Sequence, residues 1–330
     1  MSRTPLESTS AYYRALPGVG ALRFALTAAQ RLWPALAVRA AGRLFLTPLP
    51  PKWLQRGTAW DRRWRIAHWP FDDASITVYA QPTDGPVVLL VHGWGGHAGQ
   101  MRAMAQHLAD QGMHPVIVDM PAHGRSAGMR ATLPQFARVI EYVTARLAQQ
   151  GATVHAMVAH SLGAAAAACC VARSLPVARL VLIAPAASPP AYTQMFAQVF
   201  GLSEQTRDAM QRRIEAREGM LMAQFDALAC GPRILLPTLV VHDRDDKVNP
   251  FADGEAYVAA VSGAALMATR GLGHRTILKD EAVLARVAQF LADPQMPGGI
   301  KKAAPSCEGA AGVAGAASLM SFSCSAAPGQ

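Results

Sequence analysis

The sequence predicts an α/β fold: a mostly parallel central sheet with helices on both faces and a small helical cap insertion. Short apolar runs alternate with longer segments of helical periodicity over most of the chain. Several of these runs are continuously apolar, which is typical of strands buried on both faces of a parallel sheet. One interval, residues 186–235, breaks the alternation because it carries helical patterns and no strand. We therefore expect this interval to form the cap.

The composition agrees with a compact globular protein. The chain has 330 residues, of which 51% are hydrophobic and 16% are charged, and this is enough for one large domain with its own core. The five cysteines include an adjacent pair and form neither a disulfide framework nor a spaced metal set. We therefore expect a reducing, cytoplasmic compartment. Arginines interrupt the most apolar N-terminal stretch, which argues against a transmembrane span and a secretory signal.

Basic residues are concentrated near the N-terminus. The formal net charge is +9, and the first 63 residues hold ten Arg or Lys against two acidic residues. No nucleic-acid-binding motif accompanies this charge, so we expect no nucleic-acid partner. The excess belongs to a basic helical arm with a proline-rich connector, together residues 1–57.

The arm contains one predicted helix, over residues 20–47, with Arg23, Arg31 and Arg39 off its apolar stripe. Pro34 is expected to kink this helix. Two interpretations are open. The helix docks on the main domain with its charges in solvent, or it rests on anionic lipid as a peripheral contact with the inner face of a membrane.

The main domain is expected over residues 58–294. Its predicted strands, in chain order, are SITVYA (75–80), VVLLVHG (87–93), HPVIVDM (114–120), TVHAMVAHS (153–161), ARLVLIAP (178–185), PTLVVHD (237–243) and AALMATRG (264–271). Helical patterns lie between most of them, at residues 98–111, 131–149, 162–174, 251–261 and 281–292. The Gly-, Ala- and Ser-rich tail, residues 295–330, is expected to be disordered.

Four unusual sequences follow predicted strands. They are HGWGGH (92–97), HSLG (160–163) with Ser161, HDRDDKVNP (242–250) with Asp246, and GLGHR (271–275) with His274. In a parallel α/β sheet, ligands bind at the carboxyl ends of the strands. We therefore expect Ser161, Asp246 and His274 to lie close together at that edge.

With the chain order serine, acid, histidine, the sequence resembles the α/β-hydrolase family, in its serine esterase and serine aminopeptidase-like branches. Residues 159–163, AHSLG, are similar to the family's G-x-S-x-G nucleophile elbow, with Ala159 in place of the first glycine. Residues 119–126, DMPAHGRS, are similar to the D-x-P-x-H-G-x-S loop of the family. The resemblance covers residues of roughly 60–292.

The residue types suit acyl transfer. A serine hydroxyl needs a base within hydrogen-bond reach, histidine is the suitable base, and a carboxylate fixes its tautomer. We expect Ser161 as the nucleophile, although a serine at such a turn is also a common helix N-cap. His274 is the expected base and Asp246 the expected acid, while Asp243 and Asp245 are interpreted as turn residues.

Backbone N–H groups are expected to form an oxyanion hole. Leu162 at the start of the elbow helix supplies one donor, and the resemblance implies Trp94 as the second. Six further positions are expected to support the site: His92, Gly93, Gly95, Gly96, His160 and Gly163.

The predicted activity is hydrolysis of an apolar or acyl-lipid carboxylic ester through an acyl-enzyme. A thioesterase, an amidase or aminopeptidase-like hydrolase and an acyltransferase on the same triad remain open, as does a non-catalytic scaffold that binds a lipid or a partner. No cofactor or metal ion is implied, because no metal-ligand spacing and no phosphate-binding loop is present. The Met and Phe residues of the insertion are interpreted as ordinary packing more readily than as a substrate wall.

Overall fold

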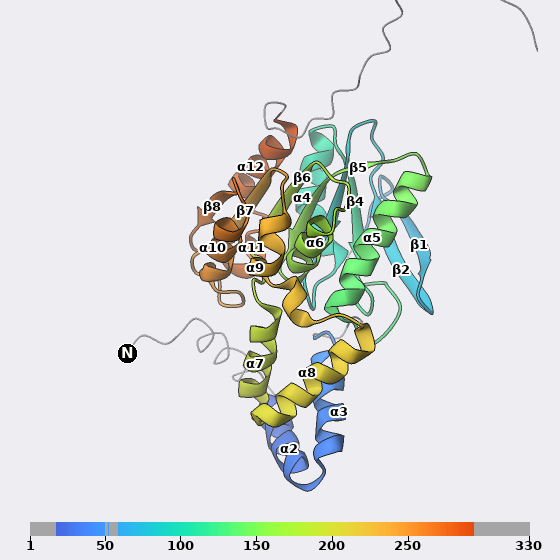
Figure 1. The fold of residues 1–330 in the computed structure, drawn as a ribbon. Coiled ribbons are helices and arrows are strands. Elements are labelled where there is room, and N and C mark those ends of the chain that lie inside the picture. Colours follow the sequence, from blue (N-terminus) through green and yellow to red (C-terminus); the bar gives the residue numbers. More distant parts are fainter. Residues whose placement is uncertain (1–17, 50–51, 53–58, 294–330) are drawn as a thin grey trace, which may run out of the picture. The chain divides into compact units, whose positions relative to one another are not determined.

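The computed structural model describes residues 18–49, 52 and 59–293. The predicted tail lies outside them, as do residues 1–17, 50, 51 and 53–57 of the predicted arm and connector. An eight-stranded sheet has the order β1-β2-β4-β3-β5-β6-β7-β8 (Figure 1). The pairs β1–β2 and β2–β4 are antiparallel, and the other neighbouring pairs are parallel. The strands are β1 (Arg65–Phe71), β2 (Ala74–Ala80), β3 (Val87–Val91), β4 (His114–Asp119), β5 (Val154–His160), β6 (Arg179–Ile183), β7 (Thr238–Asp243) and β8 (Ala265–Thr269).

The seven predicted strands all form, and β1 is an additional strand that the apolar patterns do not predict. It lies at the edge of the sheet, and Trp69 is its one buried residue. It pairs with β2 from Arg65 opposite Ala80 to Phe71 opposite Ala74. Its pairing partner specifies this strand, because an edge strand with solvent on most of its residues needs no apolar run.

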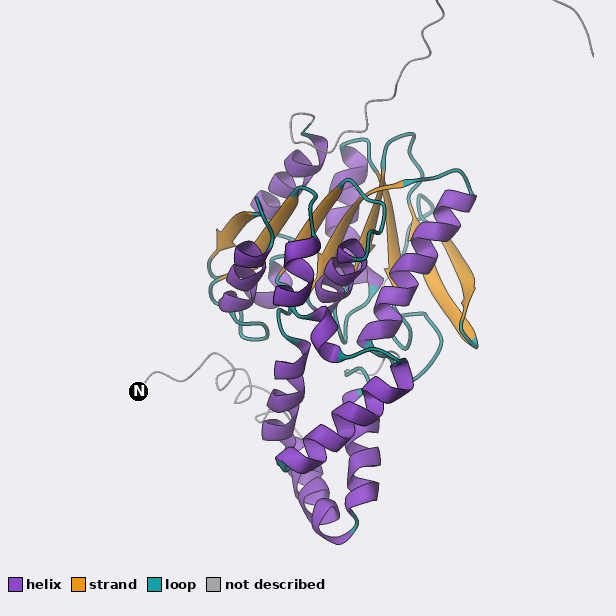
Figure 2. Cartoon of the chain, viewed as in Figure 1, coloured by secondary structure: helices purple, strands orange, loops and turns teal. Residues whose placement is uncertain are grey.

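Helices cover both faces of the sheet (Figure 2). The helices α5 (Leu133–Gln149), α6 (Leu162–Ala172) and α10 (Phe251–Ala260) pack on one face, and α4 (Ala98–Asp110) and α12 (Glu281–Ala292) on the other. Within β3, Leu89 and Val91 belong to the first core, whereas Val88 and Leu90 belong to the second. Each central strand therefore needs apolar residues on both of its faces, which explains the continuous runs.

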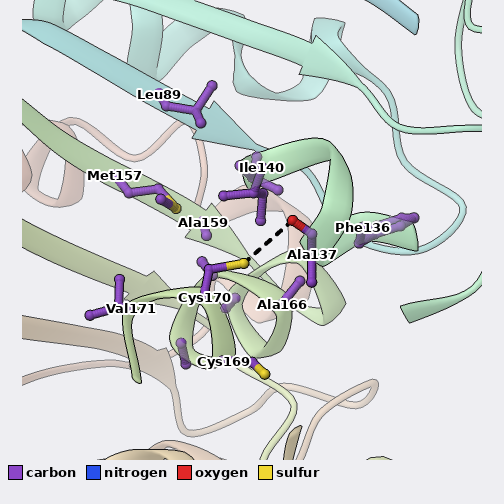
Figure 3. Packing of buried hydrophobic residues seen from close by; sticks show 14 of the residues in the cluster. Leu89, Phe136, Ala137, Ile140, Met157, Ala159, Ala166, Cys169, Cys170 and Val171 are labelled. Carbon is purple, nitrogen blue, oxygen red and sulfur yellow. Dashed lines mark hydrogen bonds between the residues drawn. The ribbon is translucent and has the colours of Figure 1, made fainter. Parts of the chain in front are cut away.

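The helix α6 approaches its neighbours closely because its side chains are small. Its sequence is LGAAAAACCVA, and every residue from Gly163 to Ala172 is buried. Figure 3 shows Cys170 turned toward α5, where its Sγ lies 3.5 Å from the carbonyl oxygen of Ala137. A larger residue at these positions would separate α6 from α5 and from the sheet.

The insertion is helical, as its pattern predicts. Its elements are α7 (Pro189–Phe200), α8 (Glu204–Glu218), η2 (Met222–Phe225), α9 (Ala227–Cys230) and η3 (Gly231–Arg233). Two N-terminal helices, α2 (Val19–Leu32) and α3 (Pro34–Phe45), lie beside α7 and α8 (Figure 1). We call α2, α3, α7 and α8 the helical lobe. Most of the Met and Phe residues of the insertion belong to its core or pack against it: Phe200, Met210 and Met222 are in the core, and Met195 and Phe196 are partly buried against it. These side chains therefore pack the lobe.

Pro34 breaks the N-terminal helix, whereas the sequence predicts a kink. Trp33 has φ −142° and ψ 74° because a proline disfavours the helical conformation in the residue before it. The two resulting helices lie side by side (Figure 1). The residues of the predicted apolar stripe are therefore distributed over two helices. Leu26 is buried in the lobe, but Leu32, Trp33 and Leu36 near the turn are 64%, 62% and 55% exposed. No described helix combines the length and the apolar character that crossing a bilayer requires.

Candidate active site

Ser161 occupies a sharp turn between β5 and α6. Its φ of 57° and ψ of −124° lie in a region that non-glycine residues rarely adopt. Its backbone N–H donates to the carbonyl oxygen of Ile183 in β6 at 2.9 Å. The turn places the Ser161 hydroxyl between two buried elements, β5 and α6, and the residue is 8% exposed.

Two glycines allow the chain to pass close to this turn. A Cβ at Gly163 would lie 2.4 Å from the carbonyl oxygen of His92, and one at Gly93 would lie 2.6 Å from the Cβ of Ser161. Real Cβ atoms essentially never approach so closely, so any side chain at these positions would displace backbone. Ala159, at the first position of the elbow, is accommodated within the buried core.

The structure brings Ser161, His274 and Asp246 together. His274 Nε2 lies 3.0 Å from Ser161 Oγ, and His274 Nδ1 lies 2.7 Å from Asp246 Oδ2. His274 belongs to α11 (Gly273–Thr276), which follows β8, and Asp246 follows the neighbouring strand β7. When Nδ1–H donates to the carboxylate, Nε2 is the acceptor for the serine proton. This is the geometry of a nucleophile, a base and an orienting acid.

Backbone donors fix the Asp246 carboxylate. Its Oδ1 accepts the N–H groups of Val248 and Asn249 at 2.7 and 3.0 Å, which leaves Oδ2 facing His274. Burial acts to raise the pKa of Asp246, but hydrogen bonds with His242 and His274 outweigh it and hold the pKa well below its ordinary value. The group is therefore ionised at neutral pH.

Asp243 and Asp245 hold the loop that carries His274. Asp243 Oδ2 accepts from the Thr269 hydroxyl at 2.7 Å and from the Leu272 N–H at 3.1 Å. Asp245 Oδ2 accepts from the Gly271 N–H at 3.0 Å. The sequence predicts that both are turn residues. In the structure, their side chains also form these hydrogen bonds to β8 and to the loop that follows it.

Two backbone N–H groups near Ser161, those of Trp94 and Leu162, are the predicted oxyanion donors. Among the described residues, no acceptor pairs with the N–H groups of Trp94 and Leu162. Leu162 begins α6, and Trp94 follows Gly93, whose backbone lies against Ser161. The Trp94 ring packs against His123, with ring centroids 5.3 Å apart.

Two buried histidines brace the loop that contains Trp94. His92 Nδ1 donates to the Gly93 carbonyl oxygen at 2.7 Å, and its Nε2 accepts the Met120 N–H at 3.0 Å. His123 Nε2 accepts the Gly95 N–H at 3.0 Å. Burial lowers the pKa of both histidines, and both rings are accordingly neutral acceptors. A further bond within the loop joins the Gly96 N–H to the Gly93 carbonyl at 3.1 Å.

His160 supports His274 from the variable position of the elbow. Its Nε2 donates to the His274 carbonyl oxygen at 2.9 Å, and the two ring centroids are 4.6 Å apart. Burial, and then the neighbouring His274, lower the pKa of His160 well below its ordinary value. His160 is therefore neutral and contacts His274 through both its ring and this hydrogen bond.

A series of polar side chains, Asn249, Tyr192 and Asp253, connects Ser161 to the insertion, and the sequence does not predict it. We call this series the polar chain. Asn249 Nδ2 lies 3.4 Å from Ser161 Oγ and donates to the Ala184 carbonyl oxygen at 2.8 Å. The Tyr192 hydroxyl of α7 lies 2.7 Å from Asn249 Oδ1 and 2.9 Å from Asp253 Oδ2. Burial raises the pKa of Asp253. The one local signal is that Asn249 follows Asp246 by three residues. Among the described residues, no group of three or more His, Cys, Asp or Glu side chains is arranged to hold a metal ion.

Comparisons with known proteins agree with this architecture. A family model described as "Serine aminopeptidase, S33" matches residues 83–216, and one described as "TAP-like protein" matches residues 229–303. A bifunctional esterase/perhydrolase from Acinetobacter calcoaceticus is 27% identical over 247 residues, which cover 58% of this chain and 86% of that protein.

Solved structures share the fold. Est1E from Butyrivibrio proteoclasticus, with ferulic acid bound, has a TM-score of 0.57 at 19% identity, over 69% of this chain and 100% of that one. A hydrolase from Pseudomonas aeruginosa has a TM-score of 0.55 at 20% identity, over 69% and 99%. These likenesses and the mostly parallel sheet show the α/β-hydrolase fold. The two family matches, together with the esterase relative, show that the chain belongs to the α/β-hydrolase family and is a hydrolase.

Proposed function

We propose that this hydrolase cleaves an apolar carboxylic ester through an acyl-enzyme on Ser161. The observation that carries the proposal is the hydrogen-bonded line from Ser161 Oγ through both nitrogens of His274 to Asp246, at 3.0 and 2.7 Å. The alternative role of Ser161 as a helix cap has less support, because its side chain makes no capping hydrogen bond to α6.

In the proposed reaction, Ser161 Oγ attacks the carbonyl carbon and its proton passes to His274 Nε2. Asp246 stabilises the imidazolium. The N–H groups of Trp94 and Leu162 donate to the oxyanion, and each stabilises the transition state by about 3 kcal/mol. The tetrahedral intermediate then expels the alcohol, which takes the proton from His274. A water molecule then attacks the acyl-enzyme as it gives a proton to His274. When this second tetrahedral intermediate collapses, His274 returns the proton to Ser161 Oγ, and the carboxylic acid leaves and ionises in solvent.

An ester is preferred among the possible substrates. The esterase activity in the name of the Acinetobacter relative supports an ester, whereas the aminopeptidase description of the family match supports an amide. We also propose that the insertion acts as a cap over the site. The contact of Tyr192 in α7 with Asn249, which lies beside Ser161, supports this role.

The test is a panel of p-nitrophenyl esters from acetyl to dodecanoyl, with a thioester and an anilide of the same acyl groups. We expect a burst of nitrophenol equal to the enzyme concentration, and ester turnover reduced at least about a thousandfold in Ser161→Ala. Ester turnover that survives in Ser161→Ala contradicts the proposal. Exclusive turnover of the thioester or the anilide reassigns the substrate class, and a folded protein that turns over none of them supports the scaffold alternative.

We propose in addition a peripheral contact of the helical lobe with the inner face of a membrane. Leu32, Trp33 and Leu36 present exposed apolar side chains near the turn between α2 and α3, and Arg31 and Arg39 flank them. Apolar and aromatic side chains bordered by arginine are typical of surfaces that lie at the level of lipid headgroups.

Vesicle co-sedimentation tests this contact. Trp33→Glu should abolish binding to vesicles that contain phosphatidylglycerol, with an unchanged melting temperature. Leu235→Glu is the matched control, because Leu235 is 89% exposed and lies just before β7. Equal binding by Trp33→Glu and the wild type would contradict the contact.

A further inference from the structure

An open groove of about 860 Å³ lies between α3 and α8 in the helical lobe. None of the residues proposed for the reaction at Ser161 lines it. Six arginines do: Arg39, Arg43, Arg130, Arg212, Arg213 and Arg217. Apolar side chains complete the lining, among them Val38, Leu46, Met210 and Ile214. We call this the arginine groove.

The positive charge of the arginine groove is mostly unbalanced. Arg212 lies 3.6 Å from Asp208, and Arg217 lies 3.7 Å from Glu218, which Arg138 shares at 3.2 Å. The remaining four form no ion pair within the described part of the chain: Arg39, Arg43, Arg130 and Arg213. Like charges gathered along one groove repel each other, so an anion bound among them is favoured.

Charge and shape together select the ligand. Four unbalanced guanidinium groups exceed what one carboxylate can neutralise, and guanidinium pairs bidentately with phosphate oxygens. Val38, which is half-buried, and Ile214, which is 6% exposed, line the same groove and offer apolar surface to hydrocarbon. The volume lies within the usual range of small-molecule sites, about 300–1,000 Å³, and is far more than a lone ion needs.

We propose that the arginine groove binds the phosphate headgroup of an anionic phospholipid, with the first acyl carbons against its apolar floor. Arg39 and Arg43 lie five and nine residues after Pro34, the first residue of α3, and hence about 7.5 and 13.5 Å along the helix from the exposed turn. These depths suit a headgroup when the turn enters the membrane interface. The inference rests on the proposed membrane contact and adds the lipid chemistry that the lobe selects.

Calorimetric titration of the full chain with dihexanoyl-phosphatidate, below the concentration at which it forms micelles, tests the inference. We expect saturable binding by the wild type. The double variant Arg43→Gln/Arg213→Gln should weaken it at least about tenfold, because each lost guanidinium removes charge-assisted hydrogen bonds. Arg62→Gln is the matched control: Arg62 is exposed, lies before β1 and does not line the groove. Its affinity should equal that of the wild type.

A second variant probes the apolar floor and retains every arginine. A Cβ at Gly42 would meet only Met210 Cγ, at 3.7 Å, which is an ordinary contact. The Gly42→Leu variant is therefore expected to fold, and leucine favours a helix interior over glycine. Because Gly42 lines the groove, the added side chain should occupy the floor and weaken lipid binding at least about tenfold.

The outcomes separate this inference from the other proposals. Trp33→Glu should lose vesicle binding and keep its affinity for the soluble lipid, and Ser161→Ala should bind that lipid as the wild type does. Dihexanoyl-phosphatidylcholine should bind at least about tenfold more weakly, since it carries no net charge. The inference would be overturned if the neutral lipid bound with equal affinity, or if inorganic phosphate at the same concentration competed with the phosphatidate. It would also be overturned if both groove variants bound as the wild type does, or if the folded wild type did not bind at all.

Discussion

Gly163→Ala tests how closely the elbow helix α6 approaches the end of β3, the strand that precedes the loop with Trp94. The new Cβ would lie 2.4 Å from the carbonyl oxygen of His92 and 2.8 Å from Val91 Cγ1. Relief of these contacts requires a shift of about 1 Å at the end of β3, and such overpacking costs about 1–3 kcal/mol. For a domain of this size, the melting temperature should fall by about 3–10 °C.

The same shift moves the Trp94 N–H away from the position proposed for the oxyanion. A displacement of about 1 Å reduces turnover by up to about 100-fold, so kcat/KM for p-nitrophenyl butyrate should fall by about 10- to 100-fold. Gly20→Ala is the control, because its Cβ would meet no atom within 4 Å and alanine favours the helix α2. A Gly163→Ala protein with the melting temperature and kcat/KM of the wild type would refute the argument from close approach.

Three further predictions concern the residues around Ser161. Asp246→Asn should lower kcat/KM by about 10⁴-fold because an amide cannot stabilise the imidazolium, whereas Asp245→Asn should stay near the wild type; equal losses would contradict the assignment. The free energy of unfolding by urea should fall as the pH drops below 6.5, by up to about 1.4 kcal/mol per pH unit for each of His92, His123 and His160. Burial depresses the pKa of these three histidines in the folded state. Below their ordinary pKa of 6.5, the unfolded chain therefore takes up protons that the folded chain excludes. A free energy of unfolding that does not change with pH in this range would contradict the argument. Tyr192→Phe should lower the free energy of unfolding by about 1–2 kcal/mol, because it removes the one hydroxyl proton that Tyr192 can donate to Asn249 Oδ1 or Asp253 Oδ2, and an unchanged value would count against the polar chain.

The sequence predicts most of the sheet because burial on both faces leaves a strong local signal. The runs around Leu89 and Val158 are continuously apolar, as two-sided burial requires. The edge strand β1 lacks that signal, because its formation depends on the partner strand more than on its own residues. The helix break at Trp33 is also not predictable from the apolar periodicity. Pro34 marks its position, but packing against the insertion decides whether the chain kinks or turns there.

The candidate site divides in the same way. Ser161, Asp246 and His274 are predictable because the ends of parallel strands converge at one edge, and their order in the chain matches a known pattern. Asn249, Tyr192 and Asp253 come from a strand-following loop, the insertion and α10. No spacing rule links residues that meet only through tertiary packing, and the same holds for the arginines that α3 and α8 bring into one groove.

Labelling of the full chain with a fluorophosphonate, followed by peptide mass mapping, tests the central claim most directly, because the reagent modifies only activated serine hydroxyls. We predict one adduct, on the peptide that contains Ser161. The rate should fall at least about a thousandfold in His274→Ala, even though the serine is unchanged in that variant. An adduct on a different serine, or the same labelling rate in His274→Ala as in the wild type, would contradict the account.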